Sequence, residues 1–356
     1  MANSWSIEAR KARWKKFMSP DSPPGYMLMA RYDEPEVPPV PPWPAAYPEK
    51  KRERIEWALA LYEHQMKQAA WLHDDFIPYL FMNTGTEIFA EAFGCRVHRP
   101  EGSNPCAIPL ITSASEVAAL KVPDLSAPSL AILFEMADEL RRRAGPEALM
   151  RTVDIQSPMD IAALIWDKNT FFIGLLDAPE AVKELADKVH RLLTAFLDEW
   201  FRRYGTEHIA HHPDYYMDGG MTLSEDEVGA VNEDMFEEFF LGELSALSRR
   251  YGGIGMHCCA NSRHQWEGFH KIHDLRLLNL YAPPTKTSQY IKDAFAFFDT
   301  RVAQMHYGWA LEGPVETWPQ QYPKDKKIVV DWWPSSKEEA IRGAAAFAEA
   351  THKLNP

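Results

Sequence analysis

The chain has 356 residues, of which 46% are hydrophobic and 25% are charged, so it can bury one large core or two smaller ones. Its formal net charge of −13 argues against a nucleic-acid partner, and the sequence has no apolar run long enough to cross a membrane. The N-terminus lacks the apolar core of a secretion signal, and four cysteines do not make a disulfide framework. These features indicate a soluble, cytoplasmic protein.

The first part of the chain combines a charged, helix-like segment with a proline-rich stretch. Residues 34–48 contain seven prolines in fifteen positions. Proline fixes φ and removes an amide donor, so this stretch is expected to be an extended loop. The segment before it is too short to be a domain. We therefore expect one domain over residues 1–356, in which residues 1–50 form an N-terminal extension and loop, followed by an amphipathic helix over 51–73.

From there, short apolar runs alternate with long helical patterns. The predicted strands are 26–31, 75–82, 149–155, 215–219, 253–258, 276–282, 302–308 and 327–333, and the predicted helices between them include 130–144, 178–204, 232–251, 287–299 and 336–354. Alternation of this kind indicates parallel strands joined by helical crossovers. Eight strands without a glycine-rich phosphate loop favour an α/β fold of the (β/α)₈ TIM-barrel type over a doubly wound sheet.

In such a barrel, the active-site side chains project from the carboxyl ends of the strands. Several predicted strands end in residues that can do chemistry, namely Arg31, Asp218, His257, Cys259, Tyr281, His306 and Asp331. Some of these also have a structural interpretation. Asp218 precedes two glycines and can simply be a turn residue. Arg31 can form an ion pair with a nearby carboxylate, and His306 can pack in the core or at the rim.

The pair His257 and Cys259 carries the sharpest prediction. Residues i and i+2 of a strand point to the same side, so the imidazole and the thiol are presented together while Cys258 faces away. An imidazole and a thiolate are typical zinc ligands, and bound zinc keeps a thiol deprotonated. The alternative is a buried strand end, because free cysteine is often buried.

Three blocks of the sequence, in this order, resemble the uroporphyrinogen decarboxylase superfamily. They are residues 155–189, residues 215–240 with "YMDGG", and residues 253–280 with "HCCAN". That superfamily consists of (β/α)₈ barrels and includes zinc-dependent methyltransferases that move methyl groups between a corrinoid protein and a thiol acceptor. The resemblance implies the same barrel, with His257 and Cys259 as zinc ligands.

The chain also departs from the family patterns. The two arginines of the decarboxylase N-terminal signature are reduced to Arg31 in "MARYDEP", which argues against a substrate with many carboxylates. The methyltransferases use a second cysteine near the last strand, whereas this chain has none beyond Cys259. A zinc site would therefore need a substitute ligand, for which Asp331 and His306 are the candidates.

The leading hypothesis is a methyltransferase-like enzyme with a metal-activated nucleophile and a corrinoid protein or another methyl donor. Asp218 would orient the substrate or carry a proton, Arg31 would meet an acidic group, and Tyr281 would line the same pocket. One alternative is a metal-free decarboxylase of a small aromatic or heterocyclic acid, and another is a non-catalytic ligand-binding barrel. The expected partners are a small-molecule substrate and a second copy in a homodimer, with no nucleic acid or membrane.

Overall fold

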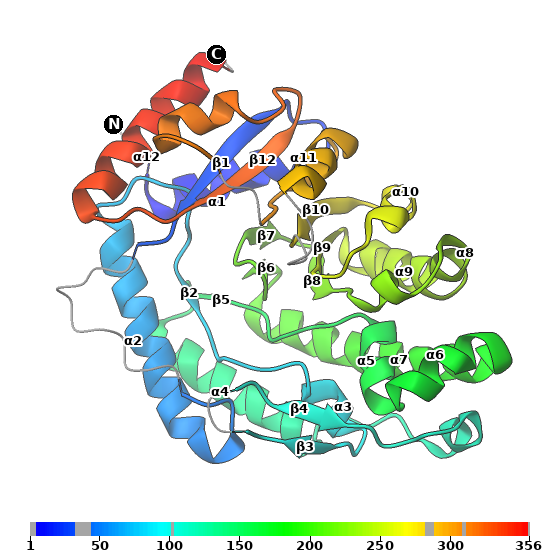
Figure 1. Cartoon of the computed structure of the whole chain (residues 1–356). Coiled ribbons are helices and arrows are strands. Elements are labelled where there is room, and N and C mark those ends of the chain that lie inside the picture. Colours follow the sequence, from blue (N-terminus) through cyan, green and yellow to red (C-terminus); the bar gives the residue numbers. More distant parts are fainter. Residues whose placement is uncertain (1–4, 33–43, 101–102, 282–287, 308–310, 355–356) are drawn as a thin grey trace.

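The computed structural model describes residues 5–32, 44–100, 103–281, 288–307 and 311–354. Its strands surround a common centre and its helices lie outside them (Figure 1). Most of the proline-rich stretch predicted to be a loop lies outside the described residues. Within the described residues, no helix combines the length and the apolar character that a membrane crossing requires.

A parallel sheet of six strands forms most of the barrel wall. Its order is β1 (Gly25–Ala30), β12 (Lys327–Trp332), β11 (Ala303–Gln304), β10 (Leu275–Leu280), β9 (Ile254–Cys258) and β8 (Met221–Ser224). These strands are rich in apolar residues because both of their faces are covered, one by the barrel interior and the other by helices. All their carboxyl ends lie at one edge, called here the mouth.

Short strands and bridges continue the wall from β8 back to β1. Gln156 forms a parallel bridge with Ser224, and it follows β5 (Leu149–Met150), which pairs in parallel with β2 (Tyr79–Leu80). The amide of Asp75, just before β2, donates to the carbonyl of Leu28 in β1 over 2.7 Å. The prediction of a (β/α)₈ barrel is confirmed.

Helices cover the outside of the wall. They are α1 (Ile7–Met18), α2 (Lys51–Ala69), α3 (Ile88–Ala92), α4 (Pro128–Ala144), α5 (Pro158–Ile165), α6 (Lys168–Asp177), α7 (Pro179–Tyr204), α8 (Glu233–Met235), α9 (Leu241–Tyr251), α10 (Trp266–His270), α11 (Ser288–Phe297) and α12 (Lys337–Leu354). The long helix α7 shows why the predicted helices form. Its apolar residues recur on one face, which is buried, and Gly205, with φ at 86°, ends it.

The fourth barrel strand is not where the sequence pattern placed it. The chain rises as β6 (Glu207–Ile209), returns as the antiparallel β7 (Tyr216–Asp218), and rises again as β8. Gly219 and Gly220, with φ at 71° and 78°, make the second reversal, which a residue with a side chain would make only with strain. The prediction that 215–219 is a parallel barrel strand is therefore wrong, and β8 takes that place. A second antiparallel hairpin, β3 (Arg96–His98) with β4 (Cys106–Ile108), was not predicted.

Candidate functional site

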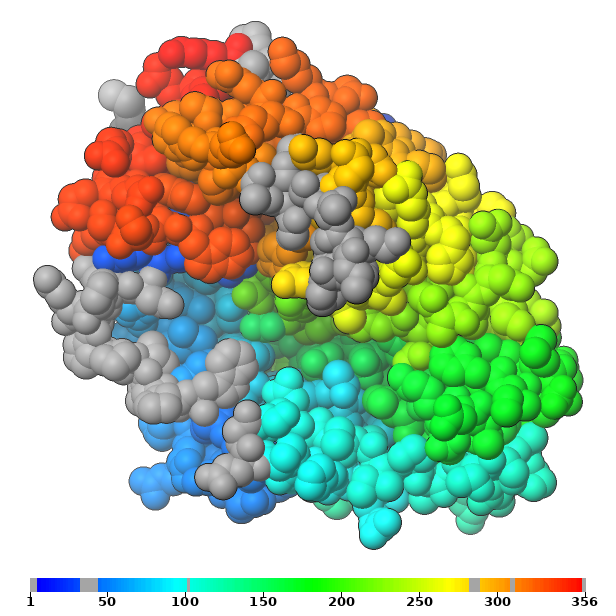
Figure 2. All heavy atoms as spheres, viewed as in Figure 1, coloured from blue at the N-terminus to red at the C-terminus, as the bar shows by residue number. Residues whose placement is uncertain are grey.

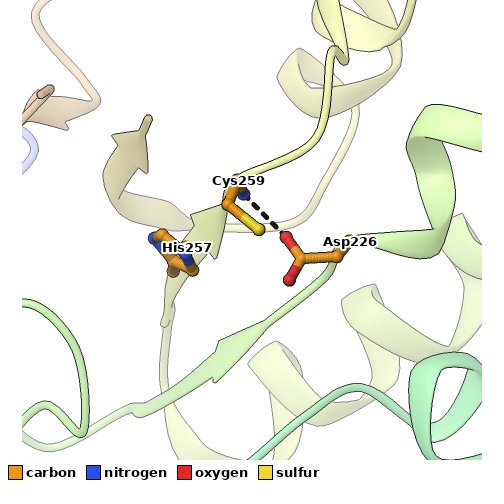
Figure 3. Close-up of side chains that lie close together, drawn as sticks. All are labelled: Asp226, His257 and Cys259. Carbon is orange, nitrogen blue, oxygen red and sulfur yellow. Dashed lines mark hydrogen bonds between the residues drawn. The ribbon is translucent and has the colours of Figure 1, made fainter. Parts of the chain in front are cut away.

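A carboxylate, an imidazole and a thiol meet at the mouth where β8 and β9 end. Ser224 of β8 pairs with His257 of β9, so the residues that follow each strand emerge side by side. Asp226, His257 and Cys259 each offer one ligand atom, and these atoms lie within 4.8 Å of one another (Figure 3). Asp226 and His257 are partly buried, whereas Cys259 is exposed. We call these three residues the ligand cluster.

Asp226 is held from both sides. Its own carboxylate Oδ1 accepts the backbone N–H of Cys259 over 2.7 Å. Behind it, the buried carboxylate of Asp160 accepts the backbone N–H groups of Asp226 and Glu227 over 2.8 and 2.9 Å. Ser157 accepts from the amide of Asp160 at the start of α5, over 3.0 Å. A helix N-terminus and a buried carboxylate thus fix the turn that presents Asp226.

The carboxylate of Asp160 is also close to the buried side chain of Glu225. Burial raises the pKa of Asp160 to about 7 and raises the pKa of Glu225 well above its usual range. For Glu225, the charge of Asp160 adds to the effect of burial, because two like charges in a low-dielectric site oppose each other. For Asp160, the hydrogen bond with Glu225 lowers the pKa and the charge of Asp226 raises it, so burial remains the main cause. The pair therefore retains a proton near neutral pH.

The orientation of His257 is fixed by Asn279, a fully buried residue of β10. The amide Nδ2 of Asn279 donates to the carbonyl of Met305, which leaves its Oδ1 facing the imidazole. His257 must therefore carry its proton on Nδ1 and offer the lone pair of Nε2. Burial lowers the pKa of His257, which favours the neutral ring that a metal requires.

The two cysteines face opposite ways, as the strand period predicts. Cys258 is fully buried, while Cys259 belongs to the ligand cluster. Loss of solvent contact on the side of the thiol that faces the protein, together with the carboxylate of Asp226 beside it, raises the pKa of Cys259 to about 12. The thiol is thus protonated unless a cation joins the cluster.

A second group of charges lies at the mouth near β1. Arg31 donates from Nε to Asp331 over 2.7 Å, from Nη1 to Asp214 over 3.2 Å, and from Nη2 to the carbonyl of Pro213 over 2.9 Å. Tyr307 donates to the other oxygen of Asp331 over 2.9 Å. We call Arg31, Arg151, Asp214 and Asp331 the ion-pair network.

The ion-pair network borders a cavity of about 600 Å³, within the usual range for small-molecule sites. Figure 2 shows a depression in the face of the molecule where the orange, blue and green parts of the chain meet. Most of the remaining walls are aromatic or apolar, from Trp57, Leu61, Phe76, Tyr79, Phe81 and Trp333.

His212 joins the cavity to the ligand cluster. It lines the cavity, and its ring centroid lies 4.4 Å from that of His257 and 6.1 Å from that of Tyr307. Burial, together with the nearby His257, lowers the pKa of His212 to about 3, so this imidazole is uncharged. Its neighbour His211 is held by Ser224 through a hydrogen bond of 2.9 Å.

Asp218 does not lie at the mouth. It ends β7 at the end of the barrel away from the mouth. There its carboxylate pairs with Lys15 over 3.2 Å and its carbonyl accepts from Arg276 over 3.3 Å. Arg276 lies at the start of β10, far from the strand end that carries Tyr281. The prediction that Asp218 shares a pocket with His257 is therefore wrong, and its structural interpretation as a residue beside the glycine turn is the better one.

The two substitute ligands predicted for zinc do not reach the ligand cluster. Asp331 is engaged by Arg31 and Tyr307. The ring of His306 accepts from the amide of Leu280 over 3.0 Å and meets the side-chain carbonyl of Gln304 over 2.9 Å, so both of its nitrogens are used. Among the described residues, Asp226 is the one grouped with His257 and Cys259. Tyr281 lies at the rim, 47% exposed, with its ring 6.1 Å from that of Tyr307.

The sequence contained a signal for Asp226 that was missed. The run "MTLS" is apolar enough for a strand, and Glu225 and Asp226 follow it directly. Carboxylates placed after a barrel strand are candidates for the mouth. The preceding "YYMDGG" has the pattern of a strand followed by a turn, so the barrel strand was predicted there and not at "MTLS".

The fold and the site define a (β/α)₈ barrel with a three-residue donor set at its mouth. The model of the family described as uroporphyrinogen decarboxylase (URO-D) matches residues 79–280, more than half of the chain, and the chain belongs to this family. Among solved structures, a methyltransferase from Methanosarcina mazei is similar, with a TM-score of 0.64, 12% sequence identity and 99% of each chain covered. No curated protein matches the sequence. At this identity the structural likeness concerns the fold.

Proposed function

We propose that the chain is a methyltransferase whose metal is held by Asp226, His257 and Cys259. The observation that carries the proposal is the convergence of three different donor atoms within 4.8 Å at the mouth. Membership in the URO-D family and the fold shared with a methyltransferase support the same reaction class.

The donor set suits zinc. Zinc binds carboxylate oxygen, imidazole nitrogen and thiolate sulfur, and catalytic zinc sites use three protein ligands and leave a fourth position open. Bound zinc would supply a Lewis acid that keeps an incoming thiol or similar acceptor deprotonated and nucleophilic. Cys259 is the exposed member of the ligand cluster, so the open position would face the mouth.

The surrounding residues would prepare this site before a reactant arrives. Asn279 selects the tautomer of His257 that offers Nε2, and Asp160 holds the turn that carries Asp226. Such partners of metal ligands usually raise metal affinity because they remove the cost of orienting the ligands. His212 would lie between the metal and the cavity that receives the organic reactant, in contact with both. The methyl group would come from a corrinoid protein or another methylated donor that reaches the open mouth.

The metal-free decarboxylase loses its support from the site. That alternative used Asp218 and Arg31 together, yet these residues lie at opposite ends of the barrel, and Arg31 is already paired with two carboxylates. A non-catalytic barrel would have no need of an oriented donor set, so it too is less well supported.

The proposal is tested by zinc stoichiometry and methyl transfer in matched cysteine variants. Protein purified without chelator should hold about one zinc per chain. Cys259→Ser should lose the zinc, and Cys258→Ser should keep it, because Cys258 faces away from the ligand cluster. Turnover of methylcobalamin with a small thiol should follow the zinc content. Zinc that is absent from the wild type, or lost equally in both variants, would refute the proposal.

A further inference from the structure

The cavity beside the ligand cluster contains charged residues that neutralise one another. Arg31 and Arg151 approach Asp214 from two sides, with Arg31 Nη1 at 3.2 Å from Oδ2 and Arg151 Nη1 at 2.9 Å from Oδ1. Asp331 takes the Nε of Arg31 at 2.7 Å. Two guanidinium groups thus meet two carboxylates, and their charges sum to zero.

Asp214 occupies the position that the carboxylate of a ligand would take between two arginines. Its backbone has φ at 72°, a left-handed conformation that aspartate adopts more readily than most residues, and both arginines contact its carboxylate. Because Asp214 belongs to the chain, it is always present beside the guanidinium groups. A carboxylate from solution would have to displace it and would also meet Asp331.

The two arginines also lie over aromatic rings of the cavity wall. The guanidinium of Arg151 lies 3.9 Å from the ring centroid of Phe81, and that of Arg31 lies 5.7 Å from that of Phe76. Flat apolar surface remains at the rim, where Trp333 is 64% exposed. The described residues that line the cavity include no lysine and no third arginine.

We infer that this cavity binds a small, net-neutral aromatic compound and rejects aromatic carboxylates, with Asp214 as the residue that sets this preference. A neutral ring can enter and stack against the aromatic wall while the ion-pair network stays intact. An aromatic acid would bring a third carboxylate to two arginines that are already paired, which is unfavourable in a partly buried site. The inference rests on the proposed function only in treating the bound compound as the organic reactant.

The test compares benzamide with benzoate, which have the same shape and differ by one charge. Dissociation constants are measured by ligand-observed NMR titration of the whole chain. We expect benzamide to bind the wild type about tenfold more tightly than benzoate, and Asp214→Asn to raise the affinity for benzoate about tenfold. Asp325→Asn removes the same charge from an exposed position before the opposite end of β12, and it should leave both constants unchanged.

A second variant locates the binding site without disturbing the ion-pair network. Trp333→Ala removes an exposed ring at the rim and should weaken benzamide binding about fivefold, because an aromatic contact is lost. Should Asp214→Asn fail to fold, this variant and the wild-type preference decide the matter. Equal or tighter binding of benzoate by the wild type would overturn the inference. A dissociation constant for benzamide that does not change in Trp333→Ala would also overturn it. Zinc content, measured on the same samples, reports separately on the proposed function.

Discussion

The ligand cluster and the ion-pair network lie at the same mouth, yet they differ in how their polar groups are satisfied. In the ion-pair network, Arg31 has three protein partners and Asp331 has two. In the ligand cluster, Asp226, His257 and Cys259 are oriented by neighbours but keep donor atoms directed at one another. The comparison teaches that a charged residue at a mouth is a better candidate for chemistry when its protein partners leave a lone pair available.

The largest expected effect is a loss of stability in Arg31→Met without a loss of metal. Arg31→Met removes a cation from between Asp214 and Asp331, and breaking a buried ion pair in this way should lower the free energy of unfolding by about 3 kcal/mol. Zinc content should not change, because Arg31 does not touch the ligand cluster. Urea unfolding and metal analysis provide the two measurements.

The matched control is Arg301→Met. Arg301 is 71% exposed in its pair with Asp299, so its loss should cost less than about 1 kcal/mol. If Arg31→Met also removed the zinc, the two groups would act as one site and the comparison would fail.

The next prediction compares the loss of zinc affinity on substituting one aspartate of the ligand cluster with the loss on substituting one aspartate of the ion-pair network. Asp226→Asn keeps the shape of the side chain but removes an anionic ligand, so zinc affinity should fall at least about 100-fold, more than for the loss of an outer partner. Asp331→Asn is the control, because Asp331 belongs to the ion-pair network. Competition with a zinc-binding dye gives both affinities. Equal losses in the two variants would mean that Asp226 is not a ligand.

A smaller effect is expected at Asn279. Asn279→Leu removes the acceptor for Nδ1 of His257, so the imidazole is no longer confined to one tautomer, and zinc affinity should fall about 30-fold. Nitrogen NMR of the imidazole in the metal-free protein should show mixed protonation of the two ring nitrogens. An unchanged tautomer with unchanged affinity would show that the ring is fixed by something other than Asn279.

The smallest effect is expected at Asp160. Asp160→Asn can still accept one of the two backbone N–H groups from Asp226 and Glu227, so the turn should loosen without opening. Zinc affinity should fall about tenfold, the lower end for partners of metal ligands. Asp167→Asn, at the N-cap of the neighbouring helix α6, tests whether any change near this face has the same result.

The sequence predicted the barrel because alternation of strands and helices is a property of local patterns. The apolar run at β9 and the long amphipathic pattern at α7 both appear where they were expected. The pair His257 and Cys259 could also be predicted from the sequence, since the strand period alone places both side chains on one face.

The third member of the ligand cluster was harder to find, because its position depends on strand register. The hairpin of β6 and β7 inserts a return pass before β8, and local propensity does not distinguish a strand that runs down from one that runs up. This ambiguity placed Asp218 at the mouth and hid Asp226. The partners of Arg31 were also hard to predict, because Asp214 and Asp331 are far from it in sequence and meet it only in the folded chain.

The hairpin of β6 and β7 and the strands that follow it contribute different residues to the mouth. Residues 210–215, which it carries, supply both His212 and Asp214 to the cavity, whereas the ligand cluster is built on β8 and β9. The residues that we propose to select the organic compound and the residues that we propose to bind a metal therefore lie on different segments of the chain. Substitutions in the segment between β6 and β7 can therefore change the walls of the cavity without touching Asp226, His257 or Cys259.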